Sequence, residues 1–594
     1  MASLPHKNHM LEFRQAQQRA IIEIIKAIKA GKTDILVQAP TGTGKSLIAL
    51  ELAKIMHERK GWKSFVLTSE KLLQAQYERD CAYKYDGRYS NVVSISGADN
   101  YECHVNGQRF PQGHCKAMGM SNRQASELPC AGLCDYLRRW NGAKVAPTAV
   151  LNYSYYLLQM NFVLEKLGER APFQARQLVI CDEAHSLPDV IEGHFACYVD
   201  QSLSYRIREV QGLLDREGVV TEFGSINASH YSRQVDRILK LSPSSVREHM
   251  DGLRELSVLL GTIKAKAAKS REELSKRFKV PLPKDGSDQA YLEASKQAAN
   301  DIPKSVTELF RATDVIRDYA GKIRDYIEIM DEQGLHNMVV EEDRNRRTYH
   351  NLSDQKLHLQ HFKPFSQVRI YLSATLQPDN LVDRWGLQPE TTHTVVLNSG
   401  WEPSNSPIRL TKTADFRYDN TEAAIEAAIQ EIDRILEAHP GERGIIHTTS
   451  YRITQAVMER CQHGGRLIDY QGTQQKMELI EDLDQLAEDA VLVGPSLVQG
   501  VDLPDDLARF NIIVKLSYPD VSSRLWKARL QLKKGIYLAE TANRLEQSSG
   551  RSTRHAEDRS VTYVLDSRAE KFVFSPNTAR YLSEEFVQRV LAGE

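Results

Sequence analysis

The feature that most constrains this chain is a glycine-rich loop between two segments of regular structure. Residues 34–38 (Asp-Ile-Leu-Val-Gln) are typical of a buried strand, and residues 46–58 are typical of a helix. Between them, residues 39–46 read Ala-Pro-Thr-Gly-Thr-Gly-Lys-Ser. A strand, a glycine-rich turn ending in Gly-Lys-Ser and a helix together make a phosphate-binding loop, where backbone amides and the helix N-terminus face an anion. The sequence therefore predicts an α/β fold with a nucleoside triphosphate site.

The residues of this loop have distinct predicted roles. Lys45 is expected to reach the β- and γ-phosphates, and the Ser46 hydroxyl is expected to bind Mg²⁺. Ala39 stands where the general pattern has glycine. The positions expected to wrap the phosphates are Ala39, Pro40, Thr41, Gly42, Thr43 and Gly44.

Two acidic residues follow a second predicted strand. Residues 178–181 are apolar, and the chain continues as Asp182-Glu183-Ala-His185. Asp182, at the carboxyl end of the strand, is expected to hold Mg²⁺, and Glu183 is expected to orient and polarise the attacking water. Hydrolysis of a nucleoside triphosphate needs both charge neutralisation and a water placed in line. The two motifs together predict an ATP hydrolase.

The same strand and helix pattern returns in the second half of the chain. Residues 200–345 are rich in helix formers, and strands are then predicted at 444–446, 490–493, 512–516 and 561–565. Strands that alternate with helices indicate parallel sheets. The length of 594 residues corresponds to a prior of about four domains, so more than one structural unit is expected.

The overall composition excludes several classes of protein. Hydrophobic residues make up 41% and charged residues 26% of the chain, as in ordinary globular proteins. No stretch approaches the ~18–20 apolar residues of a membrane span, and the N-terminal residues lack an apolar signal core. We therefore expect neither a membrane protein nor a secreted one. The formal net charge of −1 shows no basic footprint over the whole chain, which by itself argues weakly against nucleic acid as a partner; a local basic channel would be compatible with it.

Four of the eight cysteines lie within 32 residues. They are Cys103, Cys115, Cys130 and Cys134. In a chain with no signal peptide, such clustering indicates a metal rather than disulfides. Four thiolates bind either an iron–sulfur cluster or zinc. Zinc sites usually have closely spaced pairs at both ends, and only one such pair is present here, which favours [4Fe–4S]; zinc and plain reduced thiols remain alternatives.

The motifs and their order resemble the superfamily 2 helicases with a DEAH box, and more specifically the XPD/DinG group of iron–sulfur helicases. Besides the loop and the acidic pair, the resemblance rests on segments in family order over nearly the whole chain. These are Phe13-Arg-Gln-Ala-Gln17, residues 68–76 (motif Ia), 151–155, 373–376 (Ser-Ala-Thr-Leu), 444–451, 499–502 (Gln-Gly-Val-Asp) and 547–554 (Gln-Ser-Ser-Gly-Arg-Ser-Thr-Arg). Tyr153, Asp135 and Gln499 depart from the family pattern.

The resemblance implies further site residues. Gln17 is expected to read adenine, and Gly500 and Asp502 belong to the nucleotide-binding set. The remaining residues have roles in coupling or in the transition state: His185, Ser373, Ala374 and Thr375 couple the nucleotide state to the strand, Gln547 places water or the γ-phosphate, and Arg551 and Arg554 stabilise the transition state. An arginine finger is worth ~10³–10⁵ in rate in related phosphoryl transfer.

The resemblance also implies a division of the chain. Motor lobe 1 is expected to comprise residues 1–95, 143–204 and 356–400, and motor lobe 2 residues 401–594. Residues 96–142 would form the iron–sulfur domain with the four clustered cysteines as ligands, and residues 205–355 a helical arch. The fold class expected is thus α/β, with two RecA-like parallel-sheet lobes and two insertions in the first.

The implied function is an ATP-dependent DNA helicase with ATP, Mg²⁺ and a [4Fe–4S] cluster as cofactors. It would translocate 5′→3′ on single-stranded DNA, act on fork or overhang DNA, and work as a monomer with single-strand-binding, repair or replication proteins as partners. The expected compartment is the cytoplasm of a bacterium or virus-infected host, or a eukaryotic nucleus. Two alternatives stay open: a DEAH-type RNA helicase, and a nucleic-acid remodeller that translocates or clamps without unwinding.

A basic stretch at residues 524–534 carries Trp526. Basic residues with an aromatic ring suit a single strand, because the ring stacks on bases while the cations follow the phosphates. The same pattern also fits an amphipathic helix that packs against the motor. Both interpretations follow equally well from the sequence.

Overall fold

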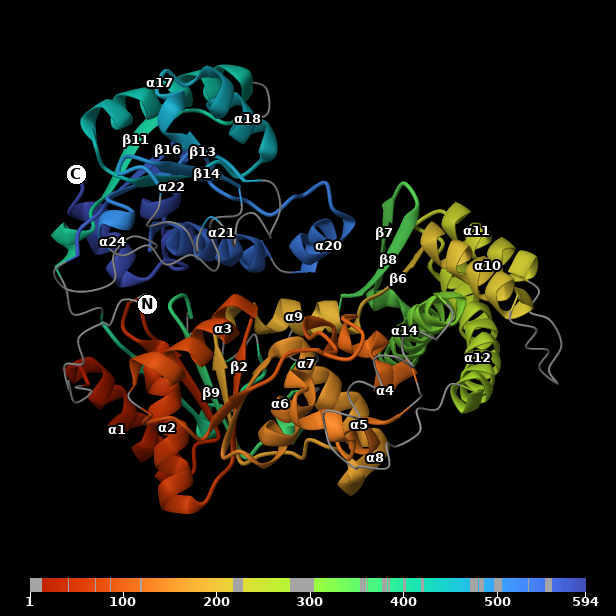
Figure 1. Ribbon diagram of the computed structural model, residues 1–594. Coiled ribbons are helices and arrows are strands. Elements are labelled where there is room, and N and C mark those ends of the chain that lie inside the picture. Colours follow the sequence, from red (N-terminus) through yellow and green to blue (C-terminus); the bar gives the residue numbers. More distant parts are fainter. Residues whose placement is uncertain are drawn as a thin grey trace.

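Two parallel sheets form the centres of two lobes, which face each other (Figure 1). The structure is a computed structural model, and the residues it describes are 13–40, 42–69, 71–85, 87–117, 120–216, 228–277, 304–352, 359, 362–376, 382, 385–398, 402–417, 421–470, 479, 486–495, 505–532, 534–550 and 558–594. The predicted α/β class with two parallel-sheet lobes is confirmed.

The first lobe is built on a seven-stranded sheet in the order β10-β1-β9-β5-β2-β4-β3. Its strands are β1 Asp34–Gln38, β2 Ser64–Thr68, β3 Val92–Ser94, β4 Thr148–Asn152, β5 Leu178–Asp182, β9 Val368–Ser373 and β10 Thr392–Val396. Its helices are α1 Gln15–Lys29, α2 Lys45–Lys60, α3 Lys71–Arg79, α7 Tyr153–Leu157, α8 Glu165–Leu167 and α9 Leu187–Phe195. Because β9 lies between β1 and β5, the glycine-rich loop, residues 373–375 and the acidic pair emerge side by side at one edge of the sheet.

A buried ion pair holds the opposite edge of this sheet together. Asp34 is the register partner of Arg369 across β1 and β9. The guanidinium donates to both carboxylate oxygens, at 2.7 and 3.0 Å, and the Tyr371 hydroxyl adds a bond of 3.1 Å. Burial opposes ionisation of Asp34, but the arginine outweighs it and lowers the pKa of the carboxyl. The pair therefore aligns the two strands that carry the site at their other ends.

The second lobe has a six-stranded sheet in the order β11-β16-β15-β12-β14-β13. Its strands are β11 Ile408–Ala414, β12 Gly444–His447, β13 Leu467–Ile468, β14 Val491–Gly494, β15 Phe510–Ile513 and β16 Val561–Asp566. Its helices are α17 Thr421–Ala438, α18 Tyr451–Arg460, α20 Arg524–Leu532, α21 Lys534–Ser549, α22 Arg568–Phe574, α23 Pro576–Ala579 and α24 Glu584–Leu591. The strand predicted at 512–516 begins and ends earlier, since the Leu516 amide leaves the ladder and donates to Asp566 instead, at 3.0 Å.

A helical insertion stands beside the first lobe (Figure 1). Its helices are α10 Gln201–Arg216, α11 Ala228–Lys240, α12 Val246–Arg277 and α14 Lys304–Gln333. A helical arch was expected for residues 205–355, but the segment also contains strands. Residues 338–351 form the hairpin of β7 Met338–Asp343 and β8 Arg346–Asn351, which pairs antiparallel with β6 Cys197–Asp200. Buried and more exposed side chains alternate along β8, the pattern of a strand with one face covered.

The cysteine-containing segment packs against the first lobe. It carries three short helices: α4 His114–Ala117, α5 Asn122–Ala125 and α6 Asp135–Val145. Tyr136, Leu137 and Trp140 of α6 belong to the same apolar core as the strands of the first sheet. Among the described helices, none is both long and apolar enough to cross a membrane.

Candidate active site

The glycine-rich loop has the backbone conformation that its glycines allow. Gly42 and Gly44 both have a φ of +78°, in the left-handed region that L side chains rarely adopt. Gly44 is also the N-cap of α2, so the helix N-terminus opens on the loop. A Cβ at Gly44 would lie 2.4 Å from Gln17 Nε2. Gly44 is therefore required both by its own φ and by the close approach of Gln17.

Gln17 and Arg14 hold the loop from the N-terminal side. Gln17 Nε2 donates to Thr43 O at 2.9 Å, and its Oε1 accepts from the Arg14 amide at 2.9 Å. The Arg14 guanidinium donates to Gly42 O at 2.7 Å. The predicted adenine reader thus uses its carboxamide to bind the loop backbone. Its contact with adenine stays a prediction, and the role of Arg14 was not foreseen.

Lys45 lies between the loop and the acidic pair. Its Nζ is 3.6 Å from Glu183 Oε1 and donates to Ala39 O at 3.5 Å. Glu183 has a φ of +52°, which is uncommon for a residue other than glycine. Such backbone conformations cluster at functional sites. The predicted cation and the predicted base are therefore neighbours.

Asp182 is buried at the end of β5 and is held by two tyrosines. The Tyr77 hydroxyl donates to its Oδ2 at 2.8 Å, and the Tyr153 hydroxyl donates to its backbone oxygen at 2.8 Å. Ser46 also lies close enough to the Tyr77 hydroxyl to influence its pKa, so one phenol neighbours both residues predicted to bind Mg²⁺. Burial, followed by the charge of Glu183, raises the pKa of Asp182 to about 6. This arrangement suits a carboxylate that is fully charged only beside a cation.

His185 joins both lobes. Its Nδ1 lies 2.8 Å from Ser373 Oγ and 3.3 Å from Glu183 Oε2. Its Nε2 lies 2.7 Å from the Gln547 amide nitrogen, which fits the tautomer with the proton on Nδ1. Gln547 belongs to α21 of the second lobe and is 362 residues away in the sequence. The predicted coupling residues His185 and Ser373 are therefore in contact, and His185 also meets Gln547, predicted to place water or the γ-phosphate, across the lobe boundary.

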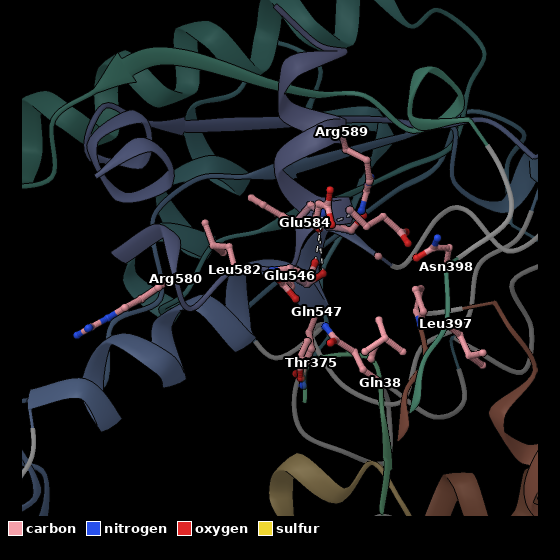
Figure 2. A pocket seen from close by; sticks show the side chains of 18 residues that line it. Gln38, Thr375, Leu397, Asn398, Glu546, Gln547, Arg580, Leu582, Glu584 and Arg589 are labelled. Atoms are coloured by element: carbon pink, nitrogen blue, oxygen red, sulfur yellow. Dashed lines mark hydrogen bonds between the residues drawn. The ribbon is translucent and has the colours of Figure 1, made fainter. Parts of the chain in front are cut away.

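A pocket of about 290 Å³ opens between the lobes next to this contact (Figure 2). Gln38, Pro40, Ala374 and Thr375 line it from the first lobe, and Gln547 lines it from the second. Thr375 Oγ1 is buried and has no hydrogen-bond partner among the described atoms. An unpaired buried hydroxyl at a pocket wall is available to a bound molecule.

Five predicted site residues lie outside the described part of the chain. They are Thr41, Gly500, Asp502, Arg551 and Arg554. Two buried tyrosines of the site, Tyr77 and Tyr153, were missed as site residues. Tyr153 was noted only as a departure from the family pattern, and nothing in the local sequence marks Tyr77 as different from a core residue of an amphipathic helix.

The four clustered cysteines lie within electrostatic range of one another and form no disulfides. Burial raises the pKa of Cys115 to about 12, and the charges of the other three thiols act in the same direction. Gly113 leaves space beside Cys103, because a Cβ there would lie 3.1 Å from its Sγ. Within the described residues, however, no three side chains of His, Cys, Asp or Glu are grouped so that they could hold a metal ion. The donor chemistry fits a metal, and the ligand set stays a prediction.

Two histidines beside these cysteines differ in environment. His104 is exposed. His114 is buried, and both its ring nitrogens lack hydrogen-bond partners in the described structure.

A second and larger cavity lies between the first lobe, the cysteine-containing segment and the helical insertion. Its volume is about 990 Å³. Its lining includes Ser69 and Lys71 from the motif Ia segment and several aromatic and cationic side chains, namely Tyr155, Phe162, Phe195, Tyr198, Arg317 and Lys322.

Part of each lobe matches the model of a known protein family. Residues 432–587 match the helicase C-terminal domain family, and residues 10–205 match the family described as type III restriction enzyme, res subunit. No curated protein sequence matches the chain significantly.

Solved structures with a similar fold include Xpd4 from S. tokodaii, with 15% identity and a TM-score of 0.58 over 96% of this chain and 99% of that one. A structure described as XPD helicase has 15% identity and a TM-score of 0.60, covering 96% of this chain and 98% of that one. A third, described as XPD in its apo form, has 14% identity and a TM-score of 0.53, covering 95% and 98%. The likeness extends over both lobes and the insertions.

Proposed function

We propose that this chain is an ATP-hydrolysing nucleic-acid helicase of the XPD/DinG type in superfamily 2, and that it translocates 5′→3′ on single-stranded DNA and unwinds duplexes ahead of it. The observation that carries the proposal is the contact of His185 with Glu183, Ser373 and Gln547. It joins the hydrolytic acid to the second lobe, as a motor that steps by lobe closure requires.

The residues of the site divide the chemistry among them. Lys45 and Ser46 would hold the phosphates, and Asp182 would hold Mg²⁺, which supplies charge neutralisation at the phosphates when bound. Glu183 accepts the proton of the attacking water. Gln547 reaches the site from the second lobe, and Arg551 and Arg554, four and seven positions further on, would add positive charge in the closed state.

The cavity beside α9 is the proposed path of the strand. Cations on its wall can neutralise phosphates, and aromatic side chains can stack on bases without selecting a sequence. Lys71 comes from the motif Ia segment, while Arg317 and Lys322 come from α14 on the opposite side. Contacts from both sides suit a strand that is enclosed rather than bound on an open surface.

The four cysteines are proposed to hold a [4Fe–4S] cluster that keeps their segment folded. Three observations support this: the thiols form no disulfides, they lie within electrostatic range of one another, and space is left beside Cys103. Iron and zinc counts, with the visible spectrum of anaerobically purified protein, test it. About four irons per chain and a brown colour are expected, whereas a colourless zinc protein would refute the cluster.

ATP turnover tests the hydrolytic assignment. Lys45→Ala and Glu183→Gln are each expected to abolish hydrolysis while the fold and strand binding are retained, since one removes the phosphate cation and the other the base. Unwinding by either variant would refute the assignment.

Strand chemistry is tested separately with the wild type. The stimulation of ATP hydrolysis by single-stranded DNA is first compared with that by single-stranded RNA. Strand displacement is then measured on forked substrates with only a 5′ or only a 3′ tail. Stimulation by RNA alone would favour the DEAH-type RNA helicase, and stimulation without strand displacement would favour the remodeller. Unwinding that requires a 3′ tail would contradict the proposed polarity.

A further inference from the structure

Helix α9 begins directly after the DEAH segment and touches three parts of the molecule. Its first residue, Leu187, lies two positions after His185. Asp189 and Glu192, three positions apart, share one face of the helix. Val190 and His194 lie on a neighbouring face and line the large cavity. A single helix thus runs from the hydrolytic site along the proposed strand path.

Arg529 of the second lobe reaches across to this helix. Its guanidinium donates to Asp189 Oδ1 at 2.9 Å and also to Glu192 Oε2. The side chains of Arg529 and Glu192 are only 13% and 7% exposed. Burial works against the charge of Arg529, but the two carboxylates outweigh it and raise its pKa. Trp526 covers the guanidinium, which lies 4.6 Å from the ring centroid. The cluster is shielded from solvent, whereas an ion pair on the exposed surface contributes little to stability.

The same junction includes the hairpin of the helical insertion. Glu341 of β7 accepts from the Ser523 hydroxyl and from the Leu525 amide, the latter at 3.3 Å. It therefore caps the N-terminus of α20, where a carboxylate is favoured. His350 of β8 lies 3.6 Å from Glu192 and 3.3 Å from Glu341. The contacts form a closed ring through α9, α20 and the hairpin, and in Figure 1 α20 projects from the second lobe toward β7 and β8.

These contacts decide between the two interpretations of the basic stretch at 524–534. Leu525 is buried, and Arg529 is committed to two acids. The stretch therefore packs as an amphipathic helix against the first lobe and the insertion, and Arg529 is not available to a strand.

We propose that Arg529 is a positioning residue that couples movement of the second lobe to the strand cavity through α9. The inference rests on the proposed function. When the lobes change their separation, the ion pairs with Asp189 and Glu192 pull on α9, and the cavity face of the same helix moves with them. Because α9 starts next to His185, the same movement reaches the hydrolytic site. Coupling between two sites in this way requires an element that both contact, and α9 meets that condition.

The test compares strand-stimulated with basal ATP hydrolysis in the full-length protein. Arg529→Gln is expected to leave basal hydrolysis unchanged and to lower stimulation by single-stranded DNA about five- to tenfold, within the usual range of couplings between sites. It should also lower unwinding per ATP consumed. Arg529→Lys should restore part of the stimulation. Arg452→Gln is the matched control, because its pair with Glu422 is exposed and lies within the second lobe.

The outcomes separate a coupling role from a structural one. If Arg529→Gln unfolds, the double variant R529M/E192M removes both buried charges, which is often neutral for stability, and it should show the same loss of stimulation. Stimulation equal to that of Arg452→Gln would overturn the inference, as would equal losses of basal and stimulated hydrolysis. A wild type without strand stimulation would instead refute the proposed function, and the inference with it.

Discussion

Removing the contact between His185 and Gln547 should reduce ATP turnover by an amount that the structure limits. The contact of 2.7 Å joins two side chains of different lobes. A hydrogen bond of this kind contributes about 0.5–1.5 kcal/mol net, which corresponds to about 2- to 13-fold in rate at 1.36 kcal/mol per decade. Gln547→Ala should therefore lower kcat by that factor through the lost contact.

His185→Ala should have the larger effect, because His185 also contacts Ser373 and Glu183. The double variant should be no slower than His185→Ala alone, since the contact is already broken in the single variant. The interaction free energy from the cycle would then be about 1 kcal/mol. Turnover is measured at saturating ATP and single-stranded DNA, with nucleotide affinity as the control for folding. Losses that simply multiply in the double variant would show that the two residues act independently and would refute the reasoning.

Three further predictions concern other parts of the fold. Gly44→Ala should weaken nucleotide binding strongly. Gly31 has a similar φ of +83° but nothing within 4 Å of an added Cβ, so Gly31→Ala should lower the stability of the fold only by the ~1–2 kcal/mol that the left-handed conformation costs. Equal effects of the two variants on nucleotide binding would contradict this. Burial raises the pKa of Glu546 from 4.5 to about 7, so the folded protein binds this proton more tightly than the unfolded chain does. As the pH rises from 5 to 7 this stabilisation is lost, and the thermal midpoint of the wild type should decrease more steeply than that of Glu546→Gln. Asp34→Ala leaves a buried guanidinium unpaired and should cost about 3–5 kcal/mol, against ~0–1 kcal/mol for Glu422→Ala in an exposed pair; similar thermal midpoints would refute the comparison.

Contiguous motifs made the local structure of the loop and of the acidic pair predictable. The loop at 39–46 needs positive φ at its glycines and a helix directly after it, and both requirements are visible in the local sequence. The acidic pair was predictable because it follows a fully apolar strand. The order of the remaining motifs then identified two lobes, and the parallel sheets confirm them.

Other features were hidden because they depend on pairing across long distances. Residues 338–351 lie at the end of a helix-rich segment. The alternation of buried and exposed side chains in β8 identifies a strand only once β8 is seen to pair with β6 and β7. The basic stretch at 524–534 had two equally good interpretations until Asp189 and Glu192 were found opposite Arg529. A charge pattern alone does not say whether its partner is a phosphate or a carboxylate.

The sequence by itself therefore determined the local structure of the loop and of the acidic pair, since their backbone requirements are met within a few consecutive residues. Only the tertiary structure decided how these segments are connected to the rest of the molecule. The bridge from Tyr77 to Asp182, the contact of His185 with Gln547 and the pairs of Arg529 with α9 join residues between 105 and 362 positions apart. Such pairs form because sheet order and lobe packing bring the side chains together, and no local pattern records which distant residue will be the partner.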